Sequence, residues 1–196
     1  ADVSGYGFFE NLDLEKTLRF LVVGEKAPEF YSANFIEDAA LILRAKTGRD
    51  GYLIAKVTAV LTLADGSVES YQWTETDTPL LPRSLQVRKA RFEIEKGLLF
   101  HYDTLRFISL VSMSDEAARS LFIESGGLLP LKRSRIYTSE RLQSGLNNLV
   151  ELLKRDGFES ATATGLHLAR DDRTGAVSAV LQIVEGKRSI VRAVQV

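Results

Sequence analysis

Few residues of this 196-residue chain combine the types and the spacing that catalysis or metal binding requires. The two histidines, His101 and His167, lie in segments with a strand pattern, and neither has a cysteine or a second histidine at metal-ligand spacing. Metal and acid–base chemistry both need several converging groups. Asp171 and Asp172 form a carboxylate pair, but they stand in "DDRTG" (171 to 175), whose residues favour a solvated turn. We therefore expect structural roles for these side chains, with no metal and no cofactor.

Two other stretches have compositions that could bind phosphate groups. "GYG" (5 to 7) lacks the third glycine and the strand-to-helix context of a phosphate loop, so we reject that role. "KRSR" (132 to 135) lies between predicted helices, and we favour a solvated loop over a contact with anionic lipid headgroups. No serine-hydrolase, zinc-protease or P-loop motif occurs. An enzyme of unknown type remains a rival hypothesis, although the sequence supplies no visible set of converging polar groups.

The composition is typical of a folded protein that does not bind nucleic acid. Hydrophobic residues make up 45% of the chain and charged residues 26%, and the net charge is -1, without the basic excess that nucleic-acid binding usually shows. No stretch approaches the roughly twenty apolar residues of a membrane-spanning helix. Cysteine is absent, which excludes disulfides but leaves the compartment open. The start, "ADVSGYG", has a small residue followed by polar sequence, the pattern left after removal of a signal peptide, and this hints at export.

Two tetrapeptides, "RDGY" (49 to 52) and "RDGF" (155 to 158), indicate that the chain contains two copies of one unit. When their glycines are aligned, Ala161 falls on Ala55. Each tetrapeptide follows apolar residues at helical spacing and precedes an alternating, strand-like pattern. We expect each glycine to end a helix in the left-handed conformation, with the aromatic residue packed back on that helix.

Each copy reads as strand, helix, helix, strand, strand. The fold class is therefore α+β, with two tandem small units in which a mixed sheet is covered on one face by two helices. The helix caps are expected at Asn11, Asn34, Ser114 and either Thr138 or Ser139. The domains are expected at residues 1 to 97, with an insertion at 67 to 86, and at 98 to 187, followed at 188 to 196 by the start of another unit.

The insertion could form a docking surface. It contains Tyr71 and Trp73, which we name as possible docking residues, and "SVESYQW" (67 to 73) could add a fourth strand to the first unit. The proline-flanked "TPLLP" (78 to 82) cannot be a central strand.

The strands after the two tetrapeptides, residues 53 to 61 and 159 to 168, are candidates for edge strands. An edge strand has unpaired backbone groups and can bind an extended peptide as an added strand. The candidate peptide-binding residues are Leu53, Ala55, Val57 and Ala59 in the first unit and Ala161, Ala163 and Leu166 in the second. The alternative is that both segments are ordinary core strands.

The repeated unit resembles a POTRA domain over nearly the whole chain. The matching pairs are Gly51-Tyr52 and Gly157-Phe158 at the Gly-aromatic position, and Glu185-Gly186 and Lys96-Gly97 at the end of the last strand, where Lys96 replaces the acid. The insertion at 67 to 86 departs from the pattern.

This resemblance implies a non-catalytic segment of a BamA- or TamA-like outer-membrane assembly protein, or of a two-partner secretion transporter. It implies a location on the periplasmic side of the outer membrane, with the membrane reached only through a C-terminal barrel that is missing from this chain. The implied partners are unfolded outer-membrane proteins, periplasmic chaperones or accessory lipoproteins. The alternative is a docking scaffold, like the POTRA domain of division or envelope proteins, that binds a folded partner.

Overall fold

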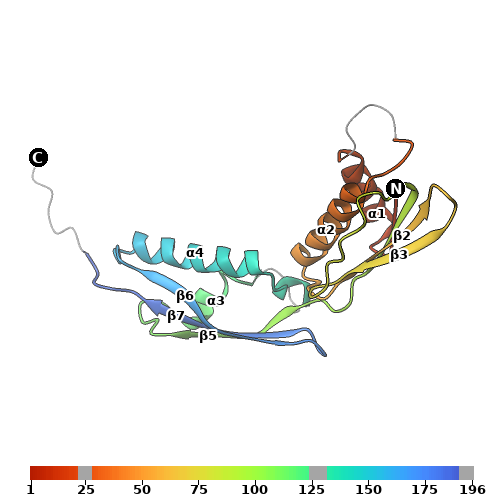
Figure 1. Cartoon of the computed structure of the whole chain (residues 1–196). Helices are drawn as coiled ribbons and strands as arrows, with labels where there is room; N and C mark the ends of the chain where they lie inside the picture. Colours follow the sequence, from red (N-terminus) through yellow and green to blue (C-terminus); the bar gives the residue numbers. More distant parts are fainter. Residues whose placement is uncertain (22–27, 124–131, 190–196) are drawn as a thin grey trace, which may run out of the picture. The chain divides into compact units, whose positions relative to one another are not determined.

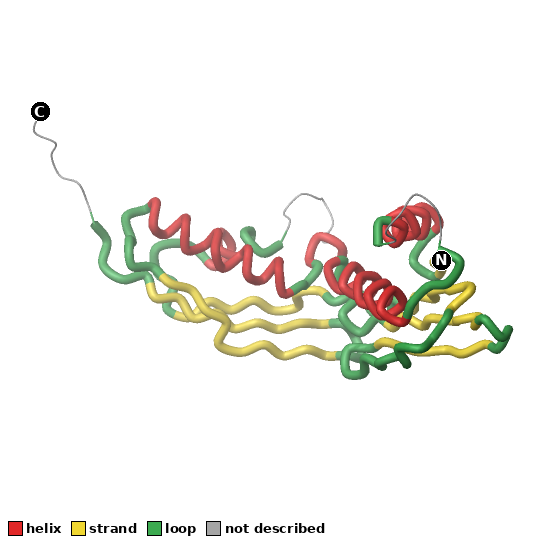
Figure 2. The backbone as a smooth tube through the Cα atoms, turned by 45° about the horizontal axis from the view of Figure 1, so that its top comes forward, coloured by secondary structure: helices red, strands yellow, loops and turns green. Residues whose placement is uncertain are grey.

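The computed structural model describes residues 1–21, 28–123 and 132–189 of the chain. The chain separates into two compact units, Ala1–Leu98 and Leu99–Val196 (Figure 1). Each unit contains one sheet with its helices on one face, as the tube view shows (Figure 2). The predicted α+β class is therefore confirmed.

The first unit has the predicted element order, with one additional strand. Its elements are β1 (Asp2–Ser4), α1 (Phe8–Arg19), α2 (Ala33–Arg49), β2 (Lys56–Leu63), β3 (Val68–Trp73) and β4 (Val87–Glu95). The strands lie in the order β1-β4-β2-β3, with β1 parallel to β4 and the other pairs antiparallel. The fourth strand predicted within the insertion is β3, and it is confirmed.

The second unit has a smaller sheet. Its elements are β5 (His101–Ile108), α3 (Asp115–Arg119), the 3-10 helix η1 (Lys132–Arg135), α4 (Ser139–Arg155), β6 (Thr162–Asp171) and β7 (Ala176–Val184). The strands lie in the order β5-β7-β6, with β5 parallel and β6 antiparallel to β7. The mixed sheet expected for each unit is therefore present in both.

The cores follow the periodicities of the sequence. Alternate residues of β2, β4 and β7 are buried, and α2 and α4 bury one stripe each. Fully buried examples are Ile36, Leu43, Leu61 and Phe92 in the first unit, and Leu149, Leu153, Leu181 and Ile183 in the second. Each such side chain stabilises the fold by roughly 1.5–3 kcal/mol relative to an exposed one.

Both repeated tetrapeptides end a helix in the same way. Gly51 and Gly157 have φ values of 93° and 98°, in the left-handed region. The N–H of the following aromatic residue donates to the carbonyl five residues earlier, from Tyr52 to Thr47 at 2.9 Å and from Phe158 to Leu153 at 3.0 Å. This is the Schellman arrangement, so the repeat has the structural role that the sequence predicted. Gly48 does not interrupt α2, which continues to Arg49.

Two of the predicted helix caps are wrong. α2 begins after Ser32, whose hydroxyl accepts a backbone N–H, and Asn34 lies inside the first turn. The start is fixed by a neighbouring contact, since Tyr31 pairs with Val87 as an isolated bridge and holds the chain extended up to Ser32. α1 begins after Gly7, so Asn11 lies within the helix. The caps predicted at Ser114 and Thr138 are confirmed.

Gly145 tests the packing of α4. A Cβ added at Gly145 would lie 2.2 Å from Cδ1 of Phe122, whereas no atom lies within 4 Å of a Cβ added at Gly48 in α2. We expect Gly145→Ala to destabilise the second unit, because overpacking costs about 1–3 kcal/mol and outweighs the roughly 0.5–1 kcal/mol that alanine gains in a helix. Gly48→Ala should stabilise the first unit by that smaller amount. Urea unfolding followed through amide NMR signals of each unit measures both, and stabilisation by both variants would contradict this packing.

Candidate functional site

The two sheets have four edge strands, β1 and β3 in the first unit and β5 and β6 in the second. Backbone N–H and C=O groups on the outer side of an edge strand have no ladder partner. They must bind side chains, water or another polypeptide. The four edges differ in how many of these groups are already bonded.

Residues 53 to 61 do not form an edge, so that prediction is wrong. Leu53 and Ala55 precede β2, and Val57 and Ala59 are fully buried. The cause is β3, which pairs with β2 over six residues and places β2 between β3 and β4. These four side chains therefore belong to the interior of the unit or to the turn before β2.

The docking surface predicted around Trp73 is also wrong. Trp73 is opposite Val57 in the ladder and therefore points to the same, helix-covered face. Its side chain is only 1% exposed. Tyr71 is half-buried on the same face, and its hydroxyl donates to Glu69 at 2.6 Å. Neither ring is presented to a partner.

The edges at β1 and β5 are capped by side chains and loops. β1 has three residues, and the N–H of Val3 donates to the Glu15 carboxylate at 3.0 Å. Along β5, three donors reach backbone carbonyls: Tyr137 N–H to Phe100 at 2.9 Å, Arg135 to Asp103 at 2.8 Å and Arg119 to Leu105 at 3.2 Å. β1 is therefore too short to receive a long strand, and two of the carbonyls of β5 are already bonded.

The outer edge of β6 is long and open. β6 has ten residues, and one side of it pairs with β7 from Thr162 to Asp171. Among the described residues, we find no hydrogen bond to the backbone of residues 162 to 169 from any element other than β7. No Asp, Glu, Lys or Arg occurs in that stretch, and almost all of it is exposed. The prediction that residues 159 to 168 include an edge strand is confirmed.

The three residues predicted in this edge have different environments. Ala161 is buried just before the strand, Ala163 is half-buried within it, and Leu166 is 62% exposed. The pairing register with β7 shifts between Gly165 and His167, which leaves Leu166 at a β-bulge. A bulge turns a side chain outward, and in many proteins it also protects an edge from aggregation.

The second open edge, β3, is shorter. β3 has six residues and carries the acidic side chain of Glu69. A charge on an edge strand disfavours the addition of an apolar strand. β6 is therefore the better candidate for binding an extended polypeptide.

The residues considered for chemistry do not converge. His101 begins β5, His167 lies in β6, and Asp171 accepts the N–H of Arg173 at 2.8 Å within the turn. The structure shows no group of three or more His, Asp or Glu side chains suited to a metal, as far as the described ranges extend. Among the helices in those ranges, none has both the length and the apolar character needed to cross a bilayer.

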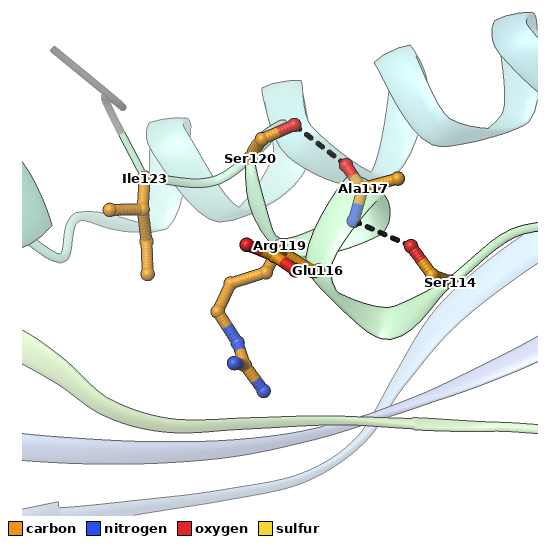
Figure 3. Close-up of a pocket in the computed structure, with 6 residues that line it drawn as sticks. All are labelled: Ser114, Glu116, Ala117, Arg119, Ser120 and Ile123. Atoms are coloured by element: carbon orange, nitrogen blue, oxygen red, sulfur yellow. Dashed lines mark hydrogen bonds between the residues drawn. The ribbon is translucent and has the colours of Figure 1, made fainter.

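A pocket of about 520 Å³ lies beside α3, lined by Ser114, Glu116, Ala117, Arg119, Ser120 and Ile123 (Figure 3). Three of its polar side chains serve the fold. The Ser114 hydroxyl caps the helix, that of Ser120 donates to the Ala117 carbonyl, and Arg119 is bonded to β5. This arrangement provides no nucleophile with an adjacent base.

Lys96 and Glu185, each next to the glycine that follows the last strand of its unit, make equivalent contacts in which one donates and the other accepts. Glu185 accepts from the N–H groups of Val111 and Ser112 at 2.7 and 2.8 Å, and the Lys96 ammonium donates to the Tyr6 carbonyl at 2.8 Å. Each contact ties the end of the last strand to the loop after the first strand. The sequence motif showed where these residues stand, but only the structure shows this role.

No family model matches the sequence, and no curated protein is significantly similar to it. The chain is similar to the solved POTRA3-5 of BamA from Haemophilus influenzae, with 15% identity and a TM-score of 0.41, covering 95% of this chain and 65% of that one. It is also similar to the N-terminal domain of Omp85 from Thermosynechococcus elongatus, with 18% identity and a TM-score of 0.46, covering 95% of this chain and 62% of that one. A third similar structure is POTRA1-2 of Omp85 from Anabaena, with 17% identity and a TM-score of 0.41, covering 96% of both chains.

This chain therefore spans less than two thirds of the length of the first two of these structures. Two of the three are POTRA domains by name, the domain type that the sequence motifs resemble. The function proposed below rests on the sheet edges and on those motifs.

Glu185→Gln tests the closing contact of the second unit. Burial alone raises the pKa of Glu185, but the N–H groups of Ser112 and Val111 and the Ser112 hydroxyl lower it below the ordinary 4.5. A lowered pKa stabilises the fold above the unfolded-state pKa, and this contribution disappears as the pH falls through the folded-state pKa.

We expect Glu185→Gln to lower the free energy of unfolding at pH 7 by about 1 kcal/mol, less than for a fully buried carboxylate because solvent screens this one. The difference from wild type should shrink below about pH 4.5. Urea titrations across pH measure this, with the exposed Glu159→Gln as control. A difference independent of pH would show that the charge of Glu185 has no role.

Proposed function

We propose that this chain is a non-catalytic polypeptide-binding module of the periplasm that holds an extended segment of a client as an added strand on β6. The observation that carries the proposal is the open edge at residues 162 to 169 of β6. At the opposite edge of the same sheet, carbonyls of β5 are already bonded by Arg119 and Arg135. An added strand would extend the three-stranded sheet to four strands without rearranging the unit.

Backbone pairing determines what kind of client would bind. Main-chain hydrogen bonds supply the affinity and do not read the sequence, so many different clients could bind. Each client loses conformational freedom when it becomes ordered, so the affinity for a single peptide is low. This combination suits a receptor for unfolded outer-membrane proteins, with chaperones or accessory lipoproteins as further partners.

The POTRA-like motifs at Gly51, Gly157 and Glu185 support a place on the periplasmic side of the outer membrane, within an assembly or translocation machine. We further propose the domain limits 1 to 97 and 98 to 187. Residues 188 to 196 would begin a following unit, and most of them lie outside the described residues.

A second candidate function is a docking scaffold for a folded partner. Two residues of the insertion bind Glu37 of α2: the Leu81 N–H donates to its carboxylate at 2.7 Å, and Arg83 pairs with it at 2.8 Å. These bonds hold the loop on the helix, while Leu80, directly before Leu81, is 80% exposed. A rigid, protruding leucine is a suitable anchor for a partner's pocket.

Paired proline substitutions test the β6 proposal. Ala163 and Thr164 are consecutive and pair one-to-one with β7, so one of their N–H groups points to β7 and the other to the open edge. We expect Ala163→Pro and Thr164→Pro to have different effects. The variant that removes an N–H donated to β7 loses stability, and the other keeps its stability but binds a labelled peptide about tenfold more weakly.

Fluorescence anisotropy with a ten-residue peptide of alternating apolar and polar residues measures the binding, and urea unfolding measures the stability. Glu69→Pro and Ser70→Pro in β3 are the matched controls and should leave the affinity unchanged. Loss of affinity only in the β3 variants, or in none of the four, would overturn the assignment to β6. Loss of affinity in Leu80→Ser would favour the scaffold.

A further inference from the structure

The helix α1 has an apolar face that points away from its own unit. Leu14 and Leu18 are buried against the core, whereas Phe8, Phe9 and Leu12 are 74%, 79% and 44% exposed. At 100° per residue, Phe9 and Leu12 lie on the side of the helix opposite Leu14 and Leu18, and Phe8 lies on the adjoining flank. Phe20, directly after the helix, is 88% exposed. We call Phe8, Phe9, Leu12 and Phe20 the apolar face of α1.

Two cations lie on the same side of the helix. Lys16 and Arg19 are exposed, and their positions fall between Phe9 and Phe20 along this side. No ion pair to either is present among the described residues. The apolar face of α1 is therefore accompanied by positive charge.

The carboxylates of α1 are mostly directed elsewhere. Glu15 accepts from the Val3 N–H and so points to the sheet. Glu10 folds back on the helix start, where its Oε2 would be 2.4 Å from a Cβ added at Gly7. Asp13 remains at the margin of the apolar face. The outward charge beside the exposed rings is therefore positive on balance.

The shape of this surface is that of a ridge. The rings of Phe8 and Phe9 stand edge to face with centroids 5.4 Å apart, and both protrude from the start of α1. Protruding apolar side chains beside cations suit shallow insertion between lipid headgroups, where rings reach the acyl boundary and cations meet phosphates.

We propose that the apolar face of α1 binds the surface of an anionic lipid bilayer. Phe8, Phe9, Leu12 and Phe20 enter the boundary between headgroups and acyl chains, and Lys16 and Arg19 contact the phosphates. The twelve-residue helix lies in the plane of the interface and does not span the bilayer. This site is distinct from β6 and would hold the first unit at a membrane surface.

Vesicle flotation of the whole chain tests this inference. The probes are vesicles of phosphatidylglycerol mixed with phosphatidylcholine and vesicles of phosphatidylcholine alone. We expect binding to the anionic vesicles that weakens at high salt, and little binding to the neutral ones. Phe8→Ser with Phe9→Ser should weaken binding about tenfold or more, and Lys16→Glu or Arg19→Glu about fivefold or more each.

Matched controls come from the same unit. Leu80→Ser removes an apolar side chain that is 80% exposed, and Lys89→Glu reverses an exposed cation of β4. Both should bind as wild type, and all variants should keep the fluorescence of the buried Trp73. Absence of binding to anionic vesicles, or binding that the α1 variants leave unchanged, would overturn the proposal. A dimer in sedimentation that Phe8→Ser with Phe9→Ser dissociates, without vesicle binding, would assign this face to a second copy of the chain.

Discussion

The pairing of backbone groups at sheet edges is the constraint on which the rest of this structure depends. A small sheet has two edges for few strands, so much of its backbone would lack partners unless other groups supplied them. Glu15 does this for β1, and Arg119, Arg135 and Tyr137 do it for β5. The capping of β5 leaves the outer side of β6 as the long uncharged edge of the second unit, and this difference singles out one strand for a function.

The two units attach their last strand to the loop after the first strand in the same place but with different side chains. Each needs its second helix to end sharply, which a glycine in the left-handed region achieves, and each needs its last strand tied to the loop after its first strand. Lys96 donates to that loop, whereas Glu185 accepts from it. The resemblance between the copies therefore lies in geometry, and side chains of opposite charge can meet the same requirement.

Sequence reasoning succeeded where the determining contacts are local. The alternation in β4 and β7, the leucine stripe of α4, the caps at Ser114 and Thr138 and the glycine helix stops all depend on neighbours within a few residues. It failed where a distant segment decides. Pairing with β3 moved β2 into the interior and turned Trp73 inward, and the contact of Tyr31 with Val87 set the start of α2. The arginines that cap β5 carry no local pattern, so the sequence could name an edge but could not show which edge stays open.

Amide hydrogen exchange along β6 tests the central claim most directly. In the free protein, the amides of residues 162 to 169 that point to the open edge should exchange quickly, in alternation with slower amides that donate to β7. Saturation with an extended client peptide should slow the outward amides and leave their neighbours unchanged. Protection that appears in β3 instead, or no change in β6 at saturation, would contradict strand addition at this edge.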